Sequence, residues 1–349
     1  MRSAKWCPNY GDSLVCAAIL RQIAPKQSIE LGIGRATRAQ PAHSLIRGST
    51  YLHVRFDFEA SIKEIDALDG TTAIVGLGAQ HPVADPKFLD SYMPARNFIA
   101  CLNEKSTSIS VRGAFSAEVV ARLGGKNIRV TGCPSLFYHL SAPKITPPVM
   151  LAGDQRRLGI SLHTGLMKNM YCSEPVRALA MHGRLITYCM ARSSHTALFE
   201  QGVLREYDVA DPALSFEDRF AAAEGILASI DKPGRLAPTD LIARMVSVQS
   251  VEEWLARMRE IDAMLGFRFH GNLVALISGK PAFFYTYDSR IDEFCALYNL
   301  PHQFVMDEWT DPINAMIEHD WADTNARFDR CLSELRAFYT ENNIAHQLH

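Results

Sequence analysis

Two arginines and a histidine stand where apolar runs that read as strands give way to helices. Arg112 has this position in the first half of the chain, and Arg268 and His270 share it in the second half. In open parallel sheets, ligands bind at the carboxyl ends of the strands. Helix N-termini at that edge offer unpaired N–H groups and a positive dipole end, which favour an anion. The spacing therefore predicts an anion-binding site built from these three residues.

A structural role is the alternative for the same side chains. Arg268 can form an ion pair, and His270 can be a loop histidine whose hydrogen bonds are satisfied within the protein. The occurrence of an arginine at the same kind of position in two separate units, with Arg112 as the other example, favours the functional interpretation.

A further candidate lies near the start of the chain, in Asn9-Tyr10-Gly11-Asp12. An amphipathic helix over 14–23 follows this loop, so that Asp12 or Ser13 is placed to cap it. Asp12 can instead hold a sugar hydroxyl or transfer a proton. The spacing alone favours the plain helix cap over these functional roles.

The residues around the arginines form two β-α-β units. In the first unit, strand, helix and strand are predicted over 107–111, 114–123 and 127–130. In the second unit, they are predicted over 264–269, 271–278 and 282–287. Asp288 is then placed to cap the helix that follows. Such units normally belong to parallel sheets that are covered on both faces.

The rest of the chain extends this alternation of strands and helices. Further strands are predicted over 28–31, 51–54, 71–77, 158–162 and 184–189. Further helices are predicted over 216–230, 251–261 and 323–349. The stretch 141–157 is rich in proline, lacks helical periodicity and is the best linker candidate. The sequence therefore predicts two α/β halves followed by a long amphipathic helix.

The overall composition is that of a globular protein without a strong charge. The chain has 349 residues, of which 48% are hydrophobic and 21% charged, and this length allows two domains. Its 36 basic and 38 acidic residues give a formal charge of −2. This balance gives no sign of a nucleic-acid or membrane-surface binder that works through bulk charge.

The cysteines, histidines and apolar runs indicate the cellular setting. The eight cysteines form no C-x-x-C pair. Five of them lie in apolar runs and are predicted to be buried free thiols, namely Cys16, Cys101, Cys189, Cys295 and Cys331. No metal-spaced histidine cluster and no signal-peptide or membrane-spanning apolar run is evident. We therefore expect no metal site and a cytoplasmic protein with at most peripheral contact with the inner face of the membrane.

Several motifs together resemble the polysaccharide pyruvyl transferase family. They fall in the family's order and cover most of the chain. The motifs are Asn9-Tyr10-Gly11-Asp12, Gly76-Leu77-Gly78-Ala79-Gln80, Ser110-Val111-Arg112-Gly113-Ala114-Phe115-Ser116, Thr131-Gly132-Cys133-Pro134-Ser135, Arg268-Phe269-His270-Gly271, Gly279-Lys280-Pro281 and Tyr287-Asp288-Ser289-Arg290. The block that begins at Arg268 is the most specific. Phe269 departs from the family, which more often has leucine there. The two glycines of 76–80 do not form the G-x-G-x-x-G fingerprint of dinucleotide-binding proteins.

The resemblance implies a GT-B-like α/β fold with two Rossmann-like domains facing a cleft. The acceptor side would be 1–142, the donor side 156–322, and the helix over 323–349 would cross back to the first domain. The implied reaction transfers pyruvate from phosphoenolpyruvate to two sugar hydroxyls, forms a ketal and releases phosphate. The implied partners are phosphoenolpyruvate and a glycan or lipid-linked sugar, without nucleic acid. No cofactor is expected beside the donor substrate.

The resemblance also implies roles for single residues. Arg112 and Arg268 would hold the anionic groups of the donor, and His270 would act as the general acid or base. The expected substrate-binding residues are Asn9, Gly11, Asp12, His163, Thr164, Gly271, Asp288 and Arg290. We expect Arg112 to converge with Arg268 and His270 across an interdomain groove.

Two other functions are compatible with the same architecture. A nucleotide-sugar-dependent glycosyltransferase would need an acidic residue on a ribose and a site for a base, and the sequence offers no clear candidate for either. A non-catalytic, anion-binding member of the fold is the second alternative. The simultaneous presence of Arg112, Arg268 and His270 argues against it.

Overall fold

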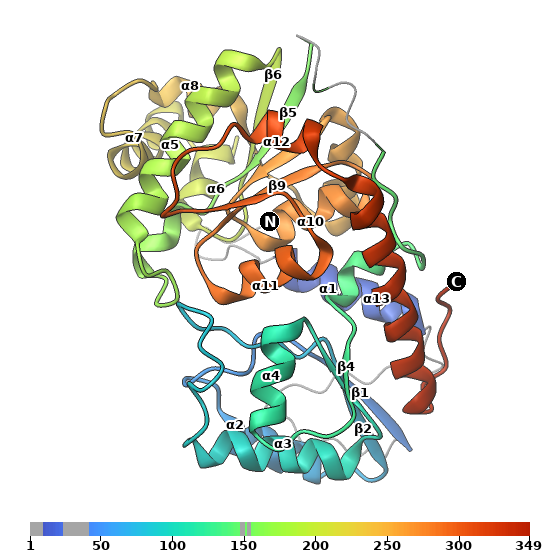
Figure 1. Ribbon diagram of the computed structural model, residues 1–349. Coiled ribbons are helices and arrows are strands. Elements are labelled where there is room, and N and C mark those ends of the chain that lie inside the picture. The colour runs from blue at the N-terminus through green and yellow to red at the C-terminus, as the bar shows by residue number, and fades with distance from the viewer. Residues whose placement is uncertain (1–9, 24–41, 147–150, 152–154) are drawn as a thin grey trace. The chain divides into compact units, whose positions relative to one another are not determined.

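The computed structural model describes residues 10–23, 42–146, 151 and 155–349. These residues divide into two compact units, whose elements are labelled in Figure 1. The C-terminal unit comprises 10–14, Pro143–Tyr287 and Asn299–Asn325. The N-terminal unit comprises Val15–Ala142, Asp288–Tyr298 and Ala326–His349. The strand predicted over 28–31 and the candidate Asn9 lie outside the described residues.

Within its described residues, the C-terminal unit is built on one parallel sheet of six strands. The strands are β5 Arg157–Ser161, β6 His195–Phe199, β7 Met245–Val246, β8 Ala263–Gly266, β9 Ala282–Thr286 and β10 His302–Phe304. Their order across the sheet is β10-β9-β8-β5-β6-β7, so the direction in which strands are added reverses between β5 and β8. This is the Rossmann order, which places a ligand crevice outside the carboxyl ends of these two strands.

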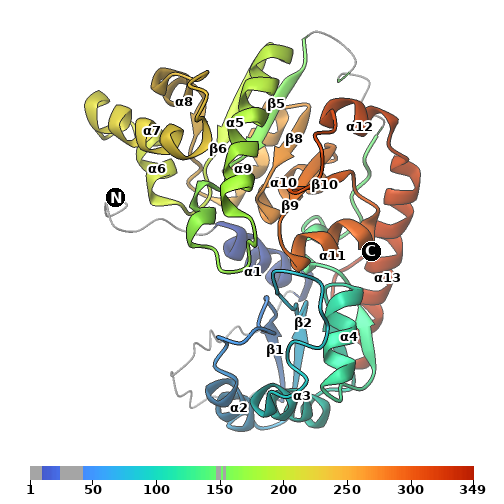
Figure 2. The same ribbon diagram turned by 60° about the vertical axis from the view of Figure 1, so that its left-hand side comes forward.

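Helices and helical turns follow the strands of this sheet. They are η3 Thr164–Lys168, α5 Pro175–Arg192, α6 Leu204–Ala210, α7 Phe216–Ile230, α8 Pro238–Arg244, α9 Val251–Arg257, η4 Met258–Glu260, α10 Phe269–Ile277 and α12 Pro312–Glu318. Figure 2 shows α6, α7 and α8 grouped on the side of the unit where β6 lies. Every residue of β8 and β9 is buried, as expected for central strands that are covered on both faces.

The N-terminal unit also has parallel strands. These are β1 His43–Arg47, β2 Thr71–Val75, β3 Ile109–Val111 and β4 Ile128–Val130. β1 pairs with β2 and β3 with β4, and a parallel bridge between Leu77 and Val111 connects the two pairs. The helices and helical turns of this unit are α2 Phe58–Asp66, α3 Met93–Lys105, α4 Ala114–Arg122, η1 Pro134–Phe137 and α11 Ser289–Tyr298. The core packs α2 against α3, where the Phe58 and Phe98 ring centroids are 5.5 Å apart.

Two further helices belong in part to the N-terminal unit. α1 Tyr10–Ile23 belongs to it from residue 15 onward, and α13 Trp321–Glu341 from residue 326 onward. The Tyr339 hydroxyl donates to the Gln22 side-chain oxygen over 2.8 Å. The buried Asn342 accepts a hydrogen bond from the Thr107 N–H over 2.9 Å and donates to the Ser108 hydroxyl over 3.0 Å. These contacts hold the C-terminal segment to the start of β3.

The predicted fold class is confirmed. The chain is α/β, with two Rossmann-like units of the GT-B-like class and a long helix near the C-terminus, α13, which ends at Glu341 and not at the predicted residue 349. The β-α-β units around 107–130 and 264–287 have their predicted order of elements, with ends shifted by three residues or fewer. Across the described residues, no helix has both the length and the apolar character needed to cross a bilayer.

Two predicted strands are wrong. The stretch 184–189 lies inside α5, and the strand that follows is β6. A short apolar run fits a buried helix face as well as a strand, and here the helical period of the longer segment prevails. The stretch 51–54 contributes only an isolated bridge at Leu52, and the strand of that region is β1.

One of the five thiols predicted to be buried is exposed. Cys16 lies on a solvent-facing side of α1, whereas Cys101, Cys189, Cys295 and Cys331 are buried. An apolar run in an amphipathic helix includes residues of both faces, so the run alone does not determine burial.

Gly266 is the last residue of β8, and substituting it tests whether the backbone that leads to Arg268 requires glycine there. Its φ is +149°, and a Cβ atom there would lie 2.3 Å from the Ser161 carbonyl oxygen. We expect Gly266→Ala to lower the free energy of unfolding by more than about 2 kcal/mol, because strain and overlap with backbone add.

Gly234→Ala is the matched control in the same unit. Gly234 has a φ of +67°, but nothing lies within 4 Å of the added atom. Its expected loss is therefore only about 1 kcal/mol. Urea unfolding followed by circular dichroism measures both variants, and equal losses would contradict the role of the close contact.

Candidate active site

The carboxyl ends of β5 and β8 carry the first group of candidates, all in the C-terminal unit. β5 leads into His163 and Thr164, and β8 leads into Arg268 and His270. Arg268 Nε donates to the Leu162 carbonyl over 2.9 Å, which holds this side chain beside the end of β5. Arg268 and His270 are half-buried. His270 lies in the first turn of α10 and not in a loop, because the helix begins two residues before its predicted start.

His163 is held by hydrogen bonds at its ring and its backbone. Its Nδ1 lies 2.9 Å from the Tyr287 hydroxyl, and its N–H donates to His182 Nε2 over 3.2 Å. His182 Nδ1 lies 2.7 Å from the Ala178 carbonyl, which only accepts, so the proton of the neutral ring is on Nδ1. Burial lowers the pKa of His182 to about 3, and its ring stacks on Phe267. His182 is therefore a neutral acceptor that positions the His163 loop.

A buried carboxylate positions the neighbouring Thr164. Glu206 is completely buried and accepts hydrogen bonds from the Thr164 N–H over 2.7 Å and from its hydroxyl over 2.8 Å. Its second oxygen lies 3.5 Å from the Gln201 N–H. Since Thr164 follows β5 and Gln201 follows β6, Glu206 connects the loops at the ends of both strands.

The first turn of α1 reaches the same edge of this unit. A Cβ atom on Gly11 would lie 2.4 Å from His270 Nδ1 and 2.8 Å from Gln201 Nε2. Only glycine therefore allows this close approach to the His270 ring. α1 already includes Tyr10, so Asp12 and Ser13 lie inside its first turn, and the prediction that one of them is the N-cap is wrong. A carboxylate in the first turn still interacts favourably with the helix dipole.

One polar cluster aligns the strands below these residues. The Asn272 side-chain amide donates to the carbonyls of Gly266 and Phe283 over 3.1 and 3.0 Å, and its oxygen accepts from the Ser161 hydroxyl over 2.7 Å. Gly271 packs closely beside it, since a Cβ atom there would lie 2.5 Å from the Ser161 Cβ. The structure thus gives Gly271 a packing function, and its predicted contact with substrate stays a prediction.

The second group of candidates lies in the N-terminal unit. Arg112 follows β3 and is only 6% exposed. Its Nε donates to the Gly76 carbonyl over 2.9 Å, and Nη2 lies 3.4 Å from the Gly48 carbonyl. Burial lowers the pKa of Arg112, and the positive charges of Arg290 and Arg47 act in the same direction. Cys133 and Glu293 act in the opposite direction. Arg112 is thus exposed to two further positive charges, and an anion bound beside them would be held by charge-assisted hydrogen bonds.

Arg290 is oriented by the carboxylate that precedes it. Its Nη2 lies 3.5 Å from Asp288 Oδ2. The same oxygen accepts from Gln80 Nε2 over 2.7 Å, and Oδ1 accepts from the Ile291 N–H over 3.1 Å. The prediction that Asp288 caps the following helix, α11, is therefore confirmed.

Sequence reasoning missed several residues that build these sites. Arg47 ends β1, and the rule that identified Arg112 would have found it if β1 had been predicted. His182 and Glu206 lie in helices, and a charged or titratable residue on a buried helix face was the available signal. The partnership of Tyr287 with His163 spans 124 residues and left no local signal.

A glutamate occupies the helix N-terminus beside Arg112. Glu293 of α11 accepts hydrogen bonds from the Ser116 N–H over 2.5 Å and from its hydroxyl over 2.8 Å, in the first turn of α4. A Cβ atom on Gly113 would lie 2.3 Å from Glu293 Cγ. The Ser116 N–H therefore already donates to a carboxyl group of the protein and is not available to bind an external anion. Burial raises the pKa of Glu293 to about 7.

Glu293 should make stability depend on pH. Its folded-state pKa of about 7 exceeds the ordinary value of 4.5, so between these values the unfolded chain loses a proton that the folded protein keeps. The free energy of unfolding therefore falls as pH rises through this window, by up to about 3 kcal/mol. Glu293→Gln keeps the shape and cannot ionise, so we expect its stability relative to wild type to increase from pH 4.5 to 7.

Urea unfolding at closely spaced pH values measures this difference. The two curves should diverge between pH 4.5 and 7 and run parallel above about pH 8. Curves that stay parallel throughout would show that Glu293 ionises normally.

The structure thus collects the candidates in two sets. His163, Thr164, Arg268 and His270 meet at the β5–β8 edge of the C-terminal unit, and Gly11 contacts His270 there. Arg112, Asp288 and Arg290 belong to the N-terminal unit. The convergence of Arg112 with Arg268 and His270 stays a prediction.

Among solved structures, the chain is similar to a putative UDP-N-acetylglucosamine 2-epimerase from Listeria monocytogenes, with 14% identity, 83% of this chain and 68% of that chain covered, and a TM-score of 0.41. It is also similar to the UDP-GlcNAc 2-epimerase of Methanocaldococcus jannaschii, with 12% identity, 84% and 76% covered and a TM-score of 0.41. The third similar structure is a trehalose-6-phosphate synthase, OtsA, with 8% identity, 87% of this chain and 72% of that chain covered, and a TM-score of 0.44. These similarities are distant.

No curated protein matches the sequence significantly. The family model described as polysaccharide pyruvyl transferase matches residues 9–289, which include every described candidate except Arg290. The matched region is most of the chain, and it contains the Arg268–His270 edge and the Arg112 cluster described above. The chain belongs to the polysaccharide pyruvyl transferase family.

Proposed function

We propose that this protein transfers pyruvate from phosphoenolpyruvate to two hydroxyls of a sugar, in a glycan or a lipid-linked precursor, and releases phosphate. The observation that carries the proposal is the pairing of Arg268 and His270 at the topological switch point of a Rossmann sheet. Membership of the family supports the class of reaction.

The donor explains the need for guanidinium groups. Phosphoenolpyruvate carries a carboxylate and a phosphate, and arginine binds both in bidentate geometry at any physiological pH. In the proposal, Arg112, Arg290 and Arg47 bind and orient anionic groups of the donor, and Arg268 stabilises charge on the departing phosphate. The positive charges of Arg290 and Arg47 acting on Arg112 support this assignment, because a bound anion would offset them.

The chemistry then needs two proton movements. One hydroxyl proton of the acceptor ends on the methylene carbon of the donor, which becomes a methyl group, and the other leaves with the phosphate. Two carbon–oxygen bonds form at the central carbon while its bond to the phosphate oxygen breaks. An imidazole that titrates near neutrality suits such transfers. We assign this role to His270, and we assign His163, Thr164 and Gly271 to substrate contacts at the same edge.

The acceptor contact is assigned to the first turn of α1. Asp12 directly follows Gly11, whose backbone approaches the His270 ring. A carboxylate there can accept a hydrogen bond from a sugar hydroxyl. The proposed reaction transfers no electrons, so phosphoenolpyruvate serves as donor substrate without a redox cofactor. A lipid-linked acceptor would bring the protein to the cytoplasmic face of a membrane.

Substitution of the proposed catalytic residues tests the proposal directly. We expect His270→Ala to slow phosphate release by about 10²–10⁴-fold, which is the usual contribution of general acid–base catalysis. Arg112→Ala should likewise lower turnover strongly, since it removes a buried charge from the donor site. The assay uses an acceptor that is identified by a pyruvate-sized gain in mass.

His195→Ala, at an exposed histidine of the same sheet, is the control and should retain wild-type turnover. Near-wild-type rates in both His270→Ala and Arg112→Ala would overturn the proposed function. Thermal protection separates the nucleotide-sugar alternative, because phosphoenolpyruvate should raise the melting temperature and nucleoside diphosphate sugars should not.

The close approach of α1 gives an independent prediction. Gly11→Ala places a methyl group 2.4 Å from His270 Nδ1, so the ring must move. Misplacement of a catalytic group by about 1 Å can lower the rate about 100-fold, and we expect a loss of that size. Ser13→Ala alters an exposed residue in the same turn and should leave phosphate release unchanged. An active Gly11→Ala enzyme would remove His270 from the proposed mechanism.

A further inference from the structure

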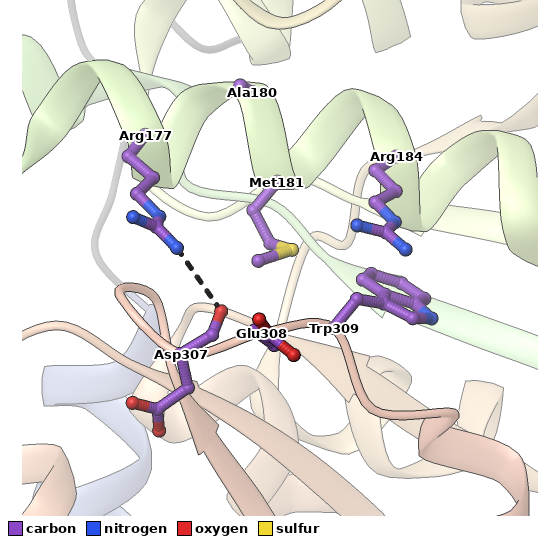
Figure 3. A pocket seen from close by; sticks show the side chains of 7 residues that line it. All are labelled: Arg177, Ala180, Met181, Arg184, Asp307, Glu308 and Trp309. Carbon is purple, nitrogen blue, oxygen red and sulfur yellow. Dashed lines mark hydrogen bonds between the residues drawn. The ribbon is translucent and has the colours of Figure 1, made fainter.

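A groove along α5 lies outside the candidate active site. Three hollows of about 560, 460 and 530 Å³ share Arg184 as a lining residue. Figure 3 shows the first hollow, with Arg177, Met181 and Arg184 projecting from α5 towards the loop of Asp307, Glu308 and Trp309. The other two hollows also share Thr187 and Arg235. We call the part lined by these two hollows the α5 groove.

The α5 groove is rich in cationic side chains. Arg184, Arg192, Lys232 and Arg235 line it. All four are exposed. In the part of the chain that the structure describes, none of these four forms an ion pair. Four unneutralised charges along one groove attract an anionic ligand and raise its rate of association.

Aromatic rings hold two of these arginines in place. The Arg184 guanidinium carbon lies 4.3 Å from the Trp309 ring centroid, and that of Arg192 lies 4.3 Å from the Tyr188 ring centroid. Trp309 is itself packed against Tyr188, with centroids 5.3 Å apart. A guanidinium that stacks on a ring keeps its N–H donors at its edge, where they can bind a carboxylate.

The two carboxylates of the groove are already engaged by the protein. Asp231 is buried and accepts a hydrogen bond from the Leu236 N–H over 2.7 Å. Asp311 accepts from the Tyr188 hydroxyl and caps α12 through the Ile313 N–H at 3.0 Å. These groups therefore do not neutralise the arginines through direct ion pairs. The exposed carboxylates Asp307 and Glu308 lie in the first hollow, outside the α5 groove.

We propose that the α5 groove binds a carboxylate-bearing stretch of glycan, so that the protein holds an acidic chain away from the reacting sugar. The inference rests on the proposed function, because each pyruvate ketal formed adds one carboxylate to the chain. Concavity favours a single extended chain over a flat membrane surface. Exposed donors on fixed arginines can bind carboxylates in bidentate geometry, and carboxylates are the anions that the proposed reaction adds to the glycan.

Direct binding measurements with the full chain test this groove. Isothermal titration with hexagalacturonate, an acidic hexasaccharide, should give a dissociation constant that rises with ionic strength. A neutral hexasaccharide of glucose should bind far more weakly. Arg235→Gln and Arg184→Gln should each weaken hexagalacturonate binding about tenfold or more, as expected for lost charge-assisted hydrogen bonds.

Arg259→Gln is the matched control, because Arg259 is an exposed arginine of η4 in the same unit and lies outside the groove. It should bind hexagalacturonate with wild-type affinity. Arg235 lies in an exposed loop, so its variant remains informative if Arg184→Gln is unstable. Circular dichroism verifies that each variant is folded.

The outcomes separate this inference from the proposed function. Wild-type affinity in both groove variants, or equal affinity for polyglutamate or for anionic lipid vesicles, would overturn the assignment of the groove to a glycan. Selective binding that depends on Arg184 and Arg235 would support it. If the protein bound the oligosaccharide in this way but released no phosphate with any acceptor, the groove would stand and the proposed reaction would fall.

Discussion

The side-chain amide of Asn272 is the interaction on which the candidate active site depends. It bonds to carbonyl groups at β8 and β9 and accepts a hydrogen bond from Ser161 at the end of β5. All of these atoms are buried, where a lost partner leaves a costly unsatisfied group. The carboxyl ends of β5 and β8 are thereby held together and tied to β9, and this fixes the positions of His163 and Arg268, which follow those two ends.

The two units use charge in different ways. In the C-terminal unit, the neutral His182 and the carboxylate of Glu206 bind backbone N–H groups and position the loops that carry His163 and Thr164. In the N-terminal unit, Arg112 experiences the like charges of Arg47 and Arg290. The first arrangement fixes the loops that carry the proposed substrate-binding residues, whereas the second brings like charges near one another, which the anionic donor of the proposed reaction would offset.

Helix α5 connects the active-site edge with the proposed glycan groove. Its buried face provides Ala178 and His182, which position His163, and its exposed face provides Arg184 and Arg192. An amphipathic helix can serve both surfaces because residues three or four positions apart share a face. One element thus supports the loop at a strand end and presents fixed cations to solvent.

The sequence by itself determined the β-α-β units around Arg112 and Arg268, because their periodicity and punctuation are local. Local pattern also identified Asp288 as a helix cap. It failed at 184–189, where a short apolar run fits helix and strand alike. Only the tertiary structure decided that Gly11 contacts His270, that Glu293 fills the N-terminus of α4 and that Arg47 repels Arg112. The spacing of residues along the chain does not encode such contacts, since they depend on how distant segments pack together.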